Sequence, residues 1–308
     1  MSGAPSLQTN LCAIALRNPV LAASGTFGYG LEFARLVDLD ALGGLVVKGL
    51  SREPIEGNPA PRLYETEAGM INSIGLQNIG VRAFVKEKLP GLARLRTAVF
   101  ANVFGYQADD YVEVARVLED HAGLAGYELN VSCPNTRHGG IYFSSDPALL
   151  AEVVAAVKRV ARRPLIVKLS PNVSAIEPLA RAAEESGADA LSLVNTFVAL
   201  AIDAHTRTPR IGAGFGGLSG PAIKPIALRM VYQAARAVKI PVVGLGGIAT
   251  GEDAAEFLIA GARAVEVGTA TFWDPRSPLR IAQELAQFLR REKIADVGEL
   301  VGTLRQMP

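Results

Sequence analysis

The chain has 308 residues, of which 49% are hydrophobic and 20% are charged, so it holds enough apolar material for a large core. Lys and Arg number 31 against 30 Asp and Glu, and the net charge of +1 gives no electrostatic footprint for nucleic acid. We therefore expect residues 1–308 to form a single α/β domain with no nucleic acid among its partners.

The N-terminus and the cysteines indicate where the protein works. Residues 1–10 lack the charged and apolar regions of a secretory signal, and no apolar run is long enough to span a bilayer. Cys12 and Cys133 form no Cys-x-x-Cys pair, which favours a reducing cytoplasm over a disulfide framework. Two thiols cannot hold an iron–sulfur cluster, and the three histidines show no metal-ligand spacing. We expect a cytoplasmic protein without a membrane segment or a metal.

Short apolar runs alternate with longer helical patterns along almost the whole chain. The apolar runs are typical of parallel strands buried on both faces, and they lie at Val20–Ala23, Leu45–Lys48, Ala98–Val103, Gly126–Val131, Leu165–Leu169, Ala190–Val194, Val242–Leu245 and Ala264–Val267. Helical patterns between them cover Asp110–His121, Pro147–Arg162, Ile176–Ser186, Pro225–Val238 and Glu252–Ile259. Asp146 is placed to cap the second of these helices, and Gly187 and Gly261 are placed to end the third and fifth.

The alternation predicts a (β/α)8 barrel. The alternative is an open doubly wound sheet, which places a G-x-G-x-x-G loop after its first strand and an acidic residue about 20 positions later. Residues 24–30, Ser-Gly-Thr-Phe-Gly-Tyr-Gly, lack that spacing, so the barrel is favoured. Two long connections, Gly49–Leu76 and Asn195–Gly220, predict lids or local hairpins around a site.

Polar residues and glycines gather at the C-terminal ends of nearly all the predicted strands. Any one of them would be an ordinary turn or cap, but one group per strand predicts an active site at that face of the barrel. In chain order the groups are Ser24-Gly25, Lys48-Gly49, Asn102, Asn130-x-Ser132-Cys133, Lys168, Asn195-Thr196, Gly246-Gly247 and Gly268-Thr269.

The last two of these groups indicate a phosphate, because glycines let backbone N–H groups approach it and barrels often hold one after strands seven and eight. Lys48 and Lys168 end strongly apolar strands, where a buried ammonium group is costly unless it meets an anion. We therefore expect both lysines to face an anionic ligand or a developing negative charge, such as that of a reduced flavin.

The two cysteines receive different interpretations. Cys12 lies in a mixed segment and is expected to be a small buried hydrophobic residue. Cys133 lies in a polar loop rich in Pro and Gly at the predicted catalytic face, where it can serve as a nucleophile or as a general base. A nucleophile would need a nearby histidine, and the sequence offers His138 without fixing its position.

Taken together, six segments resemble the dihydroorotate dehydrogenases, the flavoenzymes of pyrimidine biosynthesis, over residues 16–273. The segments are Ala22–Gly28, Val47–Gly49, Gly57–Arg62, Asn72–Asn78, Asn130–Asn135 and Gly244–Ile248. The resemblance implies one FMN per chain at the barrel mouth, held by Ser24, Lys48, Gly49, Asn102, Asn130, Lys168, Val194, Gly220, Gly246, Gly247, Gly268 and Thr269. It also implies a site for dihydroorotate or orotate formed by Lys48, Asn72, Ser73, Ile74, Gly75, Leu76, Asn130, Asn195 and Thr196.

The resemblance also implies a mechanism and a branch of the family. Cys133 matches the base that removes the C5 proton of dihydroorotate while hydride leaves C6 for the flavin. The membrane-bound branch has serine there and an N-terminal membrane segment, and this chain resembles the soluble class 1 branch instead. Residues 25–30 look like the NAD-linked type, which implies a homodimer, or a heterotetramer with a partner subunit that carries FAD and a [2Fe–2S] cluster.

Small departures from the family pattern, at Leu50-Ser51 and Ser144-Ser145, bear on the lid rather than on the assignment. Four alternatives remain open from the sequence. They are a fumarate-linked enzyme of the same family, a free-standing FMN barrel like that of dihydropyrimidine dehydrogenase, a flavin-free barrel lyase or isomerase acting on phosphosugars, and a non-catalytic scaffold subunit.

Overall fold

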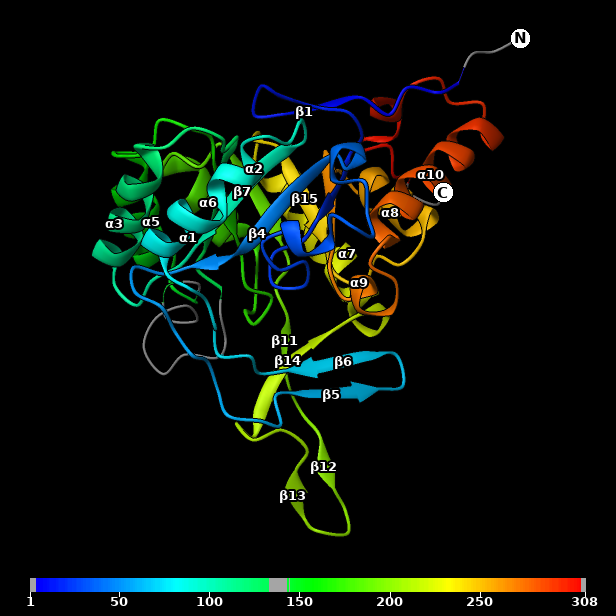
Figure 1. The fold of residues 1–308 in the computed structure, drawn as a ribbon. Helices are drawn as coiled ribbons and strands as arrows, with labels where there is room; N and C mark the ends of the chain where they lie inside the picture. Colours follow the sequence, from blue (N-terminus) through cyan, green and yellow to red (C-terminus); the bar gives the residue numbers. More distant parts are fainter. Residues whose placement is uncertain (1–3, 133–142, 144, 306–308) are drawn as a thin grey trace.

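The computed structural model describes residues 4–132, 143 and 145–305. Eight parallel strands close into a barrel, in the order of the chain, with helices around it (Figure 1). This confirms the predicted (β/α)8 barrel. The strands are β3 (Val20–Ala22), β4 (Gly44–Leu50), β7 (Ala98–Val103), β8 (Gly126–Asn130), β9 (Leu165–Lys168), β10 (Ala190–Leu193), β15 (Val242–Leu245) and β16 (Ala264–Val267).

The helices pack their apolar faces on the outside of the barrel. Asp146 caps one of them as predicted, its carboxylate accepting a hydrogen bond of 2.7 Å from the backbone N–H of Ala148. Gly187 and Gly261 follow the ends of two others with φ of +101° and +118°, conformations that favour glycine. The helices are α1 (Val81–Glu87), α2 (Leu89–Leu92), α3 (Ala108–Glu119), α5 (Pro147–Lys158), α6 (Glu177–Glu185), α7 (Lys224–Ala237), α8 (Gly251–Ile259), α9 (Ala270–Trp273) and α10 (Ser277–Arg291). Among the residues that the structure describes, no helix is both long and apolar enough to cross a membrane.

A second, antiparallel sheet lies over the C-terminal ends of the barrel strands (Figure 1). The two long connections, Gly49–Leu76 and Asn195–Gly220, form this sheet and meet where β6 pairs with β14. The expected local hairpins are therefore present. A short hairpin of β12 (Ile202–Asp203) and β13 (Thr208–Pro209) projects beyond it. The four strands of the sheet are β5 (Leu63–Thr66), β6 (Gly69–Asn72), β11 (Phe197–Leu200) and β14 (Phe215–Ser219).

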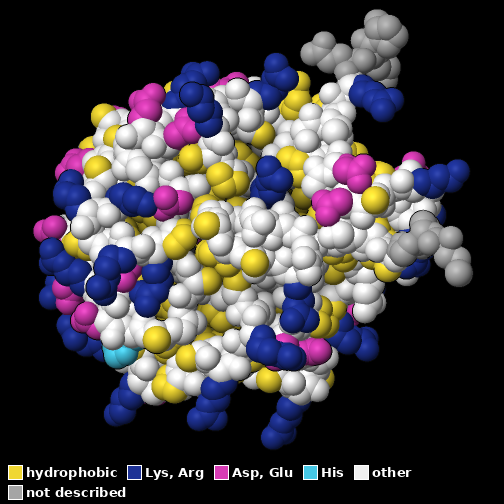
Figure 2. Space-filling view, turned by 90° about the horizontal axis from the view of Figure 1, so that it is seen from above, with side chains coloured by type: hydrophobic (Ala, Val, Ile, Leu, Met, Phe, Trp, Pro, Cys, Tyr) yellow, Lys and Arg dark blue, Asp and Glu magenta, His cyan; other side chains and the backbone are white. Residues whose placement is uncertain are grey.

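The hairpin of β1 (Thr9–Leu11) and β2 (Ile14–Leu16) covers the opposite end of the barrel (Figure 1). Leu11 and Leu16 pack there against a layer of inward-facing apolar side chains from the barrel strands. Seen from that side, Lys and Arg side chains are spread over the surface rather than gathered in one patch (Figure 2). The apolar layer comprises Leu21, Val46, Phe100, Ile166, Ala190, Val243 and Ala264.

Because alternate residues of a strand face the same side, the residues two positions later also face the barrel interior. On five strands that next residue is polar: Val46 is followed by Lys48, Phe100 by Asn102, Ile166 by Lys168, Ala190 by Ser192 and Ala264 by Glu266. The barrel is therefore filled by an apolar layer near its N-terminal end and by a polar layer just below its mouth.

Glu119, at the end of α3, anchors the connection that leads into β9. Its carboxylate is 7% exposed and accepts hydrogen bonds from the backbone N–H groups of Arg162 and Arg163, at 2.8 and 3.2 Å. Burial raises the pKa of Glu119, but the hydrogen bonds from the backbone and side chain of Arg162 outweigh it and leave the pKa below its ordinary value.

We expect Glu119→Ala to lower the free energy of unfolding by about 2–3 kcal/mol, because it leaves two backbone donors without their acceptor. The control Glu113→Ala breaks an exposed pair with Arg82 and should change it by less than about 0.5 kcal/mol. Since the folded-state pKa of Glu119 is lowered, its contribution is present above the unfolded-state pKa and is lost as pH falls through the folded-state pKa. Urea unfolding at neutral and acidic pH measures both effects, and equal losses in the two variants would contradict the anchor.

Candidate active site

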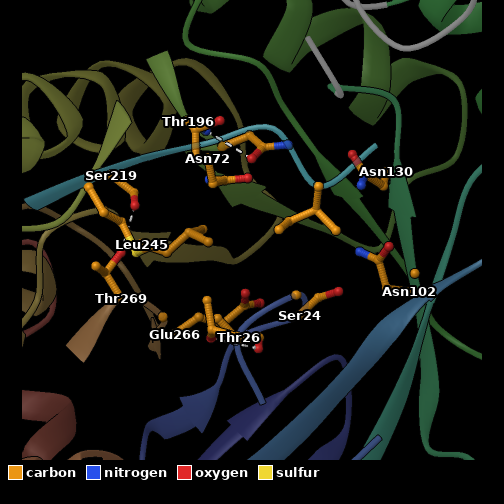
Figure 3. Close-up of a pocket in the computed structure, with 18 of the residues that line it drawn as sticks. Ser24, Thr26, Asn72, Asn102, Asn130, Thr196, Ser219, Leu245, Glu266 and Thr269 are labelled. Carbon is orange, nitrogen blue, oxygen red and sulfur yellow. Dashed lines mark hydrogen bonds between the residues drawn. The ribbon is translucent and has the colours of Figure 1, made fainter. Parts of the chain in front are cut away.

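A cavity of about 360 Å³ opens at the C-terminal ends of the barrel strands, beneath the antiparallel sheet. That volume lies in the range of small-molecule sites. In Figure 3, Asn102 and Asn130 lie on one side of the cavity and Ser219 and Thr269 on the other. All twelve residues that the sequence assigns to a cofactor line it: Ser24, Lys48, Gly49, Asn102, Asn130, Lys168, Val194, Gly220, Gly246, Gly247, Gly268 and Thr269.

The predicted phosphate loops come close together at one end of the cavity. Gly247 has φ of +83°, and a Cβ there would lie 2.8 Å from the carbonyl oxygen of Gly220. Only glycine allows this approach without strain. On the same side Thr269 donates a hydrogen bond of 2.8 Å to Ser219, which joins β16 to the antiparallel sheet. Three loops, which follow β14, β15 and β16, therefore surround the place where the sequence predicts a phosphate.

Lys168 has two carboxyl partners within the chain, which the expectation of an anionic ligand or a developing negative charge did not include. Its ammonium lies 3.2 Å from Glu128 and 3.5 Å from Glu266, inside the barrel. The sequence analysis missed both carboxylates. The sequence did contain a signal for them, because each is the one charged residue in its strand, Glu128 in β8 and Glu266 in β16.

Lys48 differs from Lys168 because no described residue forms a hydrogen bond or ion pair with its ammonium group. Its side chain is half-buried at the cavity wall. Burial lowers the pKa of Lys48, and the charge of Arg62 lowers it further, against a smaller opposing effect of Glu32. An anionic ligand in the cavity would relieve this cost, which agrees with the expectation for this lysine.

Six of the seven remaining residues assigned to a substrate also line the cavity: Asn72, Ile74, Gly75, Leu76, Asn195 and Thr196. Ser73 does not, because it is buried beside the loop that precedes β5, where its hydroxyl accepts a hydrogen bond of 2.7 Å from Asn58. Ser73 follows the end of β6 and is turned away from the cavity, although its neighbours Asn72 and Ile74 line it. The sequence analysis did not identify Met70, Gln77, Leu245 or Phe272, which also line it.

Ser132 fixes the start of the loop that carries the predicted base. It is fully buried, its hydroxyl donates a hydrogen bond of 2.9 Å to Asn130 Oδ1, and it accepts one of 2.8 Å from Asn195 Nδ2. Ser132 is therefore held between two residues of the cavity wall. Cys133 itself and His138 lie outside the described residues.

The sequence matches the family model described as "Dihydroorotate dehydrogenase" over residues 6–289. It is 82% identical over 301 residues to a protein of Solibacter usitatus named putative dihydroorotate dehydrogenase A (fumarate), covering 98% of this chain and 99% of that one. The chain belongs to the dihydroorotate dehydrogenase family.

Other members of the dihydroorotate dehydrogenase family carry different names. A protein of Citrifermentans bemidjiense, named the catalytic subunit of dihydroorotate dehydrogenase B (NAD(+)), is 52% identical over 97% of this chain and 98% of its own length. The crystal structure of a dihydroorotate dehydrogenase from Eimeria tenella, with ferulenol, superposes with a TM-score of 0.80 at 23% identity, covering 97% of this chain and 88% of that one. At that identity the likeness shows the shared barrel fold.

Cys12, the second cysteine, lies in the β1–β2 turn at the far end of the barrel. It is half-buried and donates a hydrogen bond of 3.2 Å to the carbonyl oxygen of Asp189. Burial, and then the charge of Asp189, raise the pKa of Cys12 to about 12. The expectation that Cys12 is a small buried residue is therefore confirmed only in part, because the side chain is half-buried.

We expect Cys12 to resist alkylation by iodoacetamide at pH 8. With a pKa of about 12, only about one thiol in 10⁴ is ionised at that pH, against about one in four at the ordinary cysteine pKa of about 8.5. Mass spectrometry of peptides from the native chain, with the urea-unfolded chain as control, measures the labelling of Cys12. Labelling as fast in the native chain as in the unfolded one would contradict the buried hydrogen bond.

Proposed function

We propose that the chain oxidises (S)-dihydroorotate to orotate in de novo pyrimidine biosynthesis, with FMN bound in the cavity and Cys133 as the general base. One observation carries the proposal: the twelve residues matched to the FMN site of the family come from eight strand ends and one added sheet, yet line one cavity. We also propose that residues 1–308 act as one domain and that the reaction takes place in the cytoplasm, where a free thiol stays reduced.

Two features of the cavity support FMN as the group it holds. Asn102 lines the cavity, and its buried Oδ1 has no hydrogen-bond partner among the described residues, which leaves this amide an acceptor to offer to a polar heterocycle. Backbone of Gly220, Gly247 and Gly268 lies open on the opposite side, suited to a phosphate. When bound, FMN would supply the hydride acceptor that no side chain offers.

The residues of the chain would divide the remaining work. Lys48 would bind the carboxylate of dihydroorotate, because its ammonium is the cavity charge without a counter-ion in the described structure. Asn72, Asn130, Asn195 and Thr196 would orient the ring through amide and hydroxyl groups. Cys133, which follows the anchored Ser132, would take the C5 proton as its thiolate, so the reaction should speed up with rising pH until the thiol is ionised.

The names of the relatives point to two candidate electron acceptors. We propose NAD⁺, reached through a partner subunit with FAD and a [2Fe–2S] cluster, from residues 25–30 and from relatives whose names include "(NAD(+)), catalytic subunit". This arrangement would form a heterotetramer around a homodimer of the present chain. Fumarate is the second candidate, favoured by the name of the 82% identical relative.

Anaerobic flavin spectroscopy tests the function and its acceptor together. Dihydroorotate should bleach the FMN absorbance of the purified chain, and the reduced enzyme should then be offered fumarate or NAD⁺. Reoxidation by fumarate in the isolated chain would establish the second candidate, whereas reoxidation by NAD⁺ only after co-purification with a partner would support the first. A chain that stays colourless after addition of FMN would exclude the redox function.

We expect Cys133→Ala to keep FMN but to lower the rate of flavin reduction by dihydroorotate by about 10²–10⁴-fold, the usual contribution of a general base. Cys133→Ser should also be impaired and should recover only at high pH, since a hydroxyl is a much weaker acid than a thiol. Cys12→Ala is the matched control, because that thiol lies at the opposite end of the barrel, and it should reduce at the wild-type rate. Stopped-flow measurement of the three variants decides, and near-normal reduction in Cys133→Ala would refute the base.

A further inference from the structure

The polar layer below the cavity contains two carboxyl groups and one ammonium group. Glu128, Glu266 and Lys168 are 0%, 1% and 5% exposed. They project inward from β8, β16 and β9, which do not all neighbour one another in the barrel, so the contact is made across its interior. Glu266 and Lys168 also line the cavity, whereas Glu128 lies behind them.

The charges of this group do not balance if every side chain is in its ordinary state. Two carboxylates and one ammonium carry a net charge of −1 on side chains that are almost fully buried, which is costly. Both carboxyl groups contact the same ammonium group, so the single positive charge of Lys168 faces two negative ones. One proton retained by the two carboxyl groups removes this imbalance.

The hydrogen bonds indicate which carboxyl group keeps the proton. Glu128 accepts from Asn102 Nδ2 at 2.5 Å, from Ser192 Oγ at 2.9 Å and from Lys168 Nζ at 3.2 Å. Glu266 accepts only the longer contact of 3.5 Å from Lys168. Three donors stabilise a negative charge on Glu128, so Glu266 is the neutral acid of the pair.

The pKa directions agree with this assignment. Burial and then the charge of Glu128 raise the pKa of Glu266 well above its ordinary value. For Glu128 burial acts in the same direction, but the charge of Lys168 and the hydrogen bonds outweigh it and lower the pKa. Burial lowers the pKa of Lys168, but the two carboxyl groups outweigh it and keep the ammonium charged.

The surroundings contain few other charges that could disturb this balance. Of the described residues that line the cavity, the charged ones are Lys48, Lys168 and Glu266. The strands on either side of β16 pair Leu21 and Leu245 with Glu266, so neither neighbour adds a charge at that level. Glu266 is therefore governed by Glu128 and Lys168, with Lys48 at the cavity wall.

We propose that Glu128 and Glu266 share one proton and thereby act as positioning residues that fix the charge Lys168 presents to the bound flavin. The inference rests on the proposed function for the identity of the ligand. With neutral ligand in the cavity, Lys168 is balanced by Glu128 alone. When the ligand gains negative charge, Lys168 attracts it, and Glu128 can take a proton from solvent so that the site stays neutral.

Infrared spectroscopy of the FMN-free full chain tests the shared proton directly. The wild type should show the C=O stretching band of a buried carboxylic acid. Glu266→Gln should abolish it, and so should Glu128→Gln, because the remaining carboxyl group then ionises beside Lys168. Glu119→Gln, which alters a buried but ionised carboxylate elsewhere, should leave the band in place. A wild type without the band, or a band that survives in Glu266→Gln, would overturn the proposal.

Unfolding as a function of pH gives a second measurement without flavin. A group whose pKa is higher in the folded state than in the unfolded state stabilises the fold at pH values below its unfolded-state pKa. That stability is lost as the pH rises through the folded-state pKa. Above about pH 4.3, the ordinary pKa of glutamate, wild type should therefore lose stability relative to Glu266→Gln. Parallel stability curves for the two proteins would count against a neutral Glu266.

The equilibrium between oxidised and reduced flavin in the holoenzyme tests the effect on Lys168. Glu266→Gln imitates the neutral acid, so its ratio of reduced to oxidised flavin at a fixed dye potential should stay within about tenfold of wild type. The double variant Glu128→Gln/Glu266→Gln leaves Lys168 without a counter-charge and should raise that ratio at least about tenfold. An unchanged ratio in the double variant would overturn the proposed effect. Failure to bind FMN would instead overturn the proposed function, while the two flavin-free measurements still decide whether a proton is shared.

Discussion

Alternation of side chains along the barrel strands determines the site more than any single residue does. A closed barrel must fill its interior, and each strand turns every second side chain inward. Where the inward residue is Val46, Phe100 or Ile166, it joins a dry layer that the β1–β2 hairpin covers. Two positions later the same strands place Lys48, Asn102 and Lys168 at the cavity. The apolar layer thus holds the polar layer at a fixed height below the mouth.

This arrangement makes the buried charges tolerable. Lys168 and Glu128 are almost fully buried, and an unpaired charge would be costly there. They are supported by Asn102 on one neighbouring strand and Ser192 on the other, at positions that the parallel register brings level with them. The network therefore depends on the strand pairing, and a shift of register by one residue would turn these polar side chains into the apolar layer between barrel and helices.

The barrel, its eight strands and the polar groups at the strand ends could be predicted because they repeat along the chain and depend on local pattern, whereas Val194, Gly220 and residues 72–76 were assigned through the family resemblance. The sequence did not predict the partners of Lys168. Glu128 and Glu266 are 138 residues apart in the sequence, and only barrel closure brings them together. Ser73 shows a second limit, since a motif assigns a whole segment to a site, whereas in the fold this one residue turns away and hydrogen-bonds Asn58 instead. The contact of β6 with β14 likewise joins two connections that no local pattern links.

The two lysines of the cavity show how one residue type can serve two purposes. Lys168 is surrounded by carboxyl groups and held inside the barrel, so its charge is already balanced before a ligand enters. Lys48 is on β4 at the cavity wall, half-buried, and its ammonium has no counter-ion among the described residues. Burial lowers the pKa of Lys48, and the charge of Arg62 lowers it further. A ligand with a fixed negative charge gains most beside Lys48, whereas a group whose charge appears only during reaction gains most beside Lys168. The position of each lysine, rather than its chemistry, therefore separates binding of an anion from stabilisation of a charge that forms later.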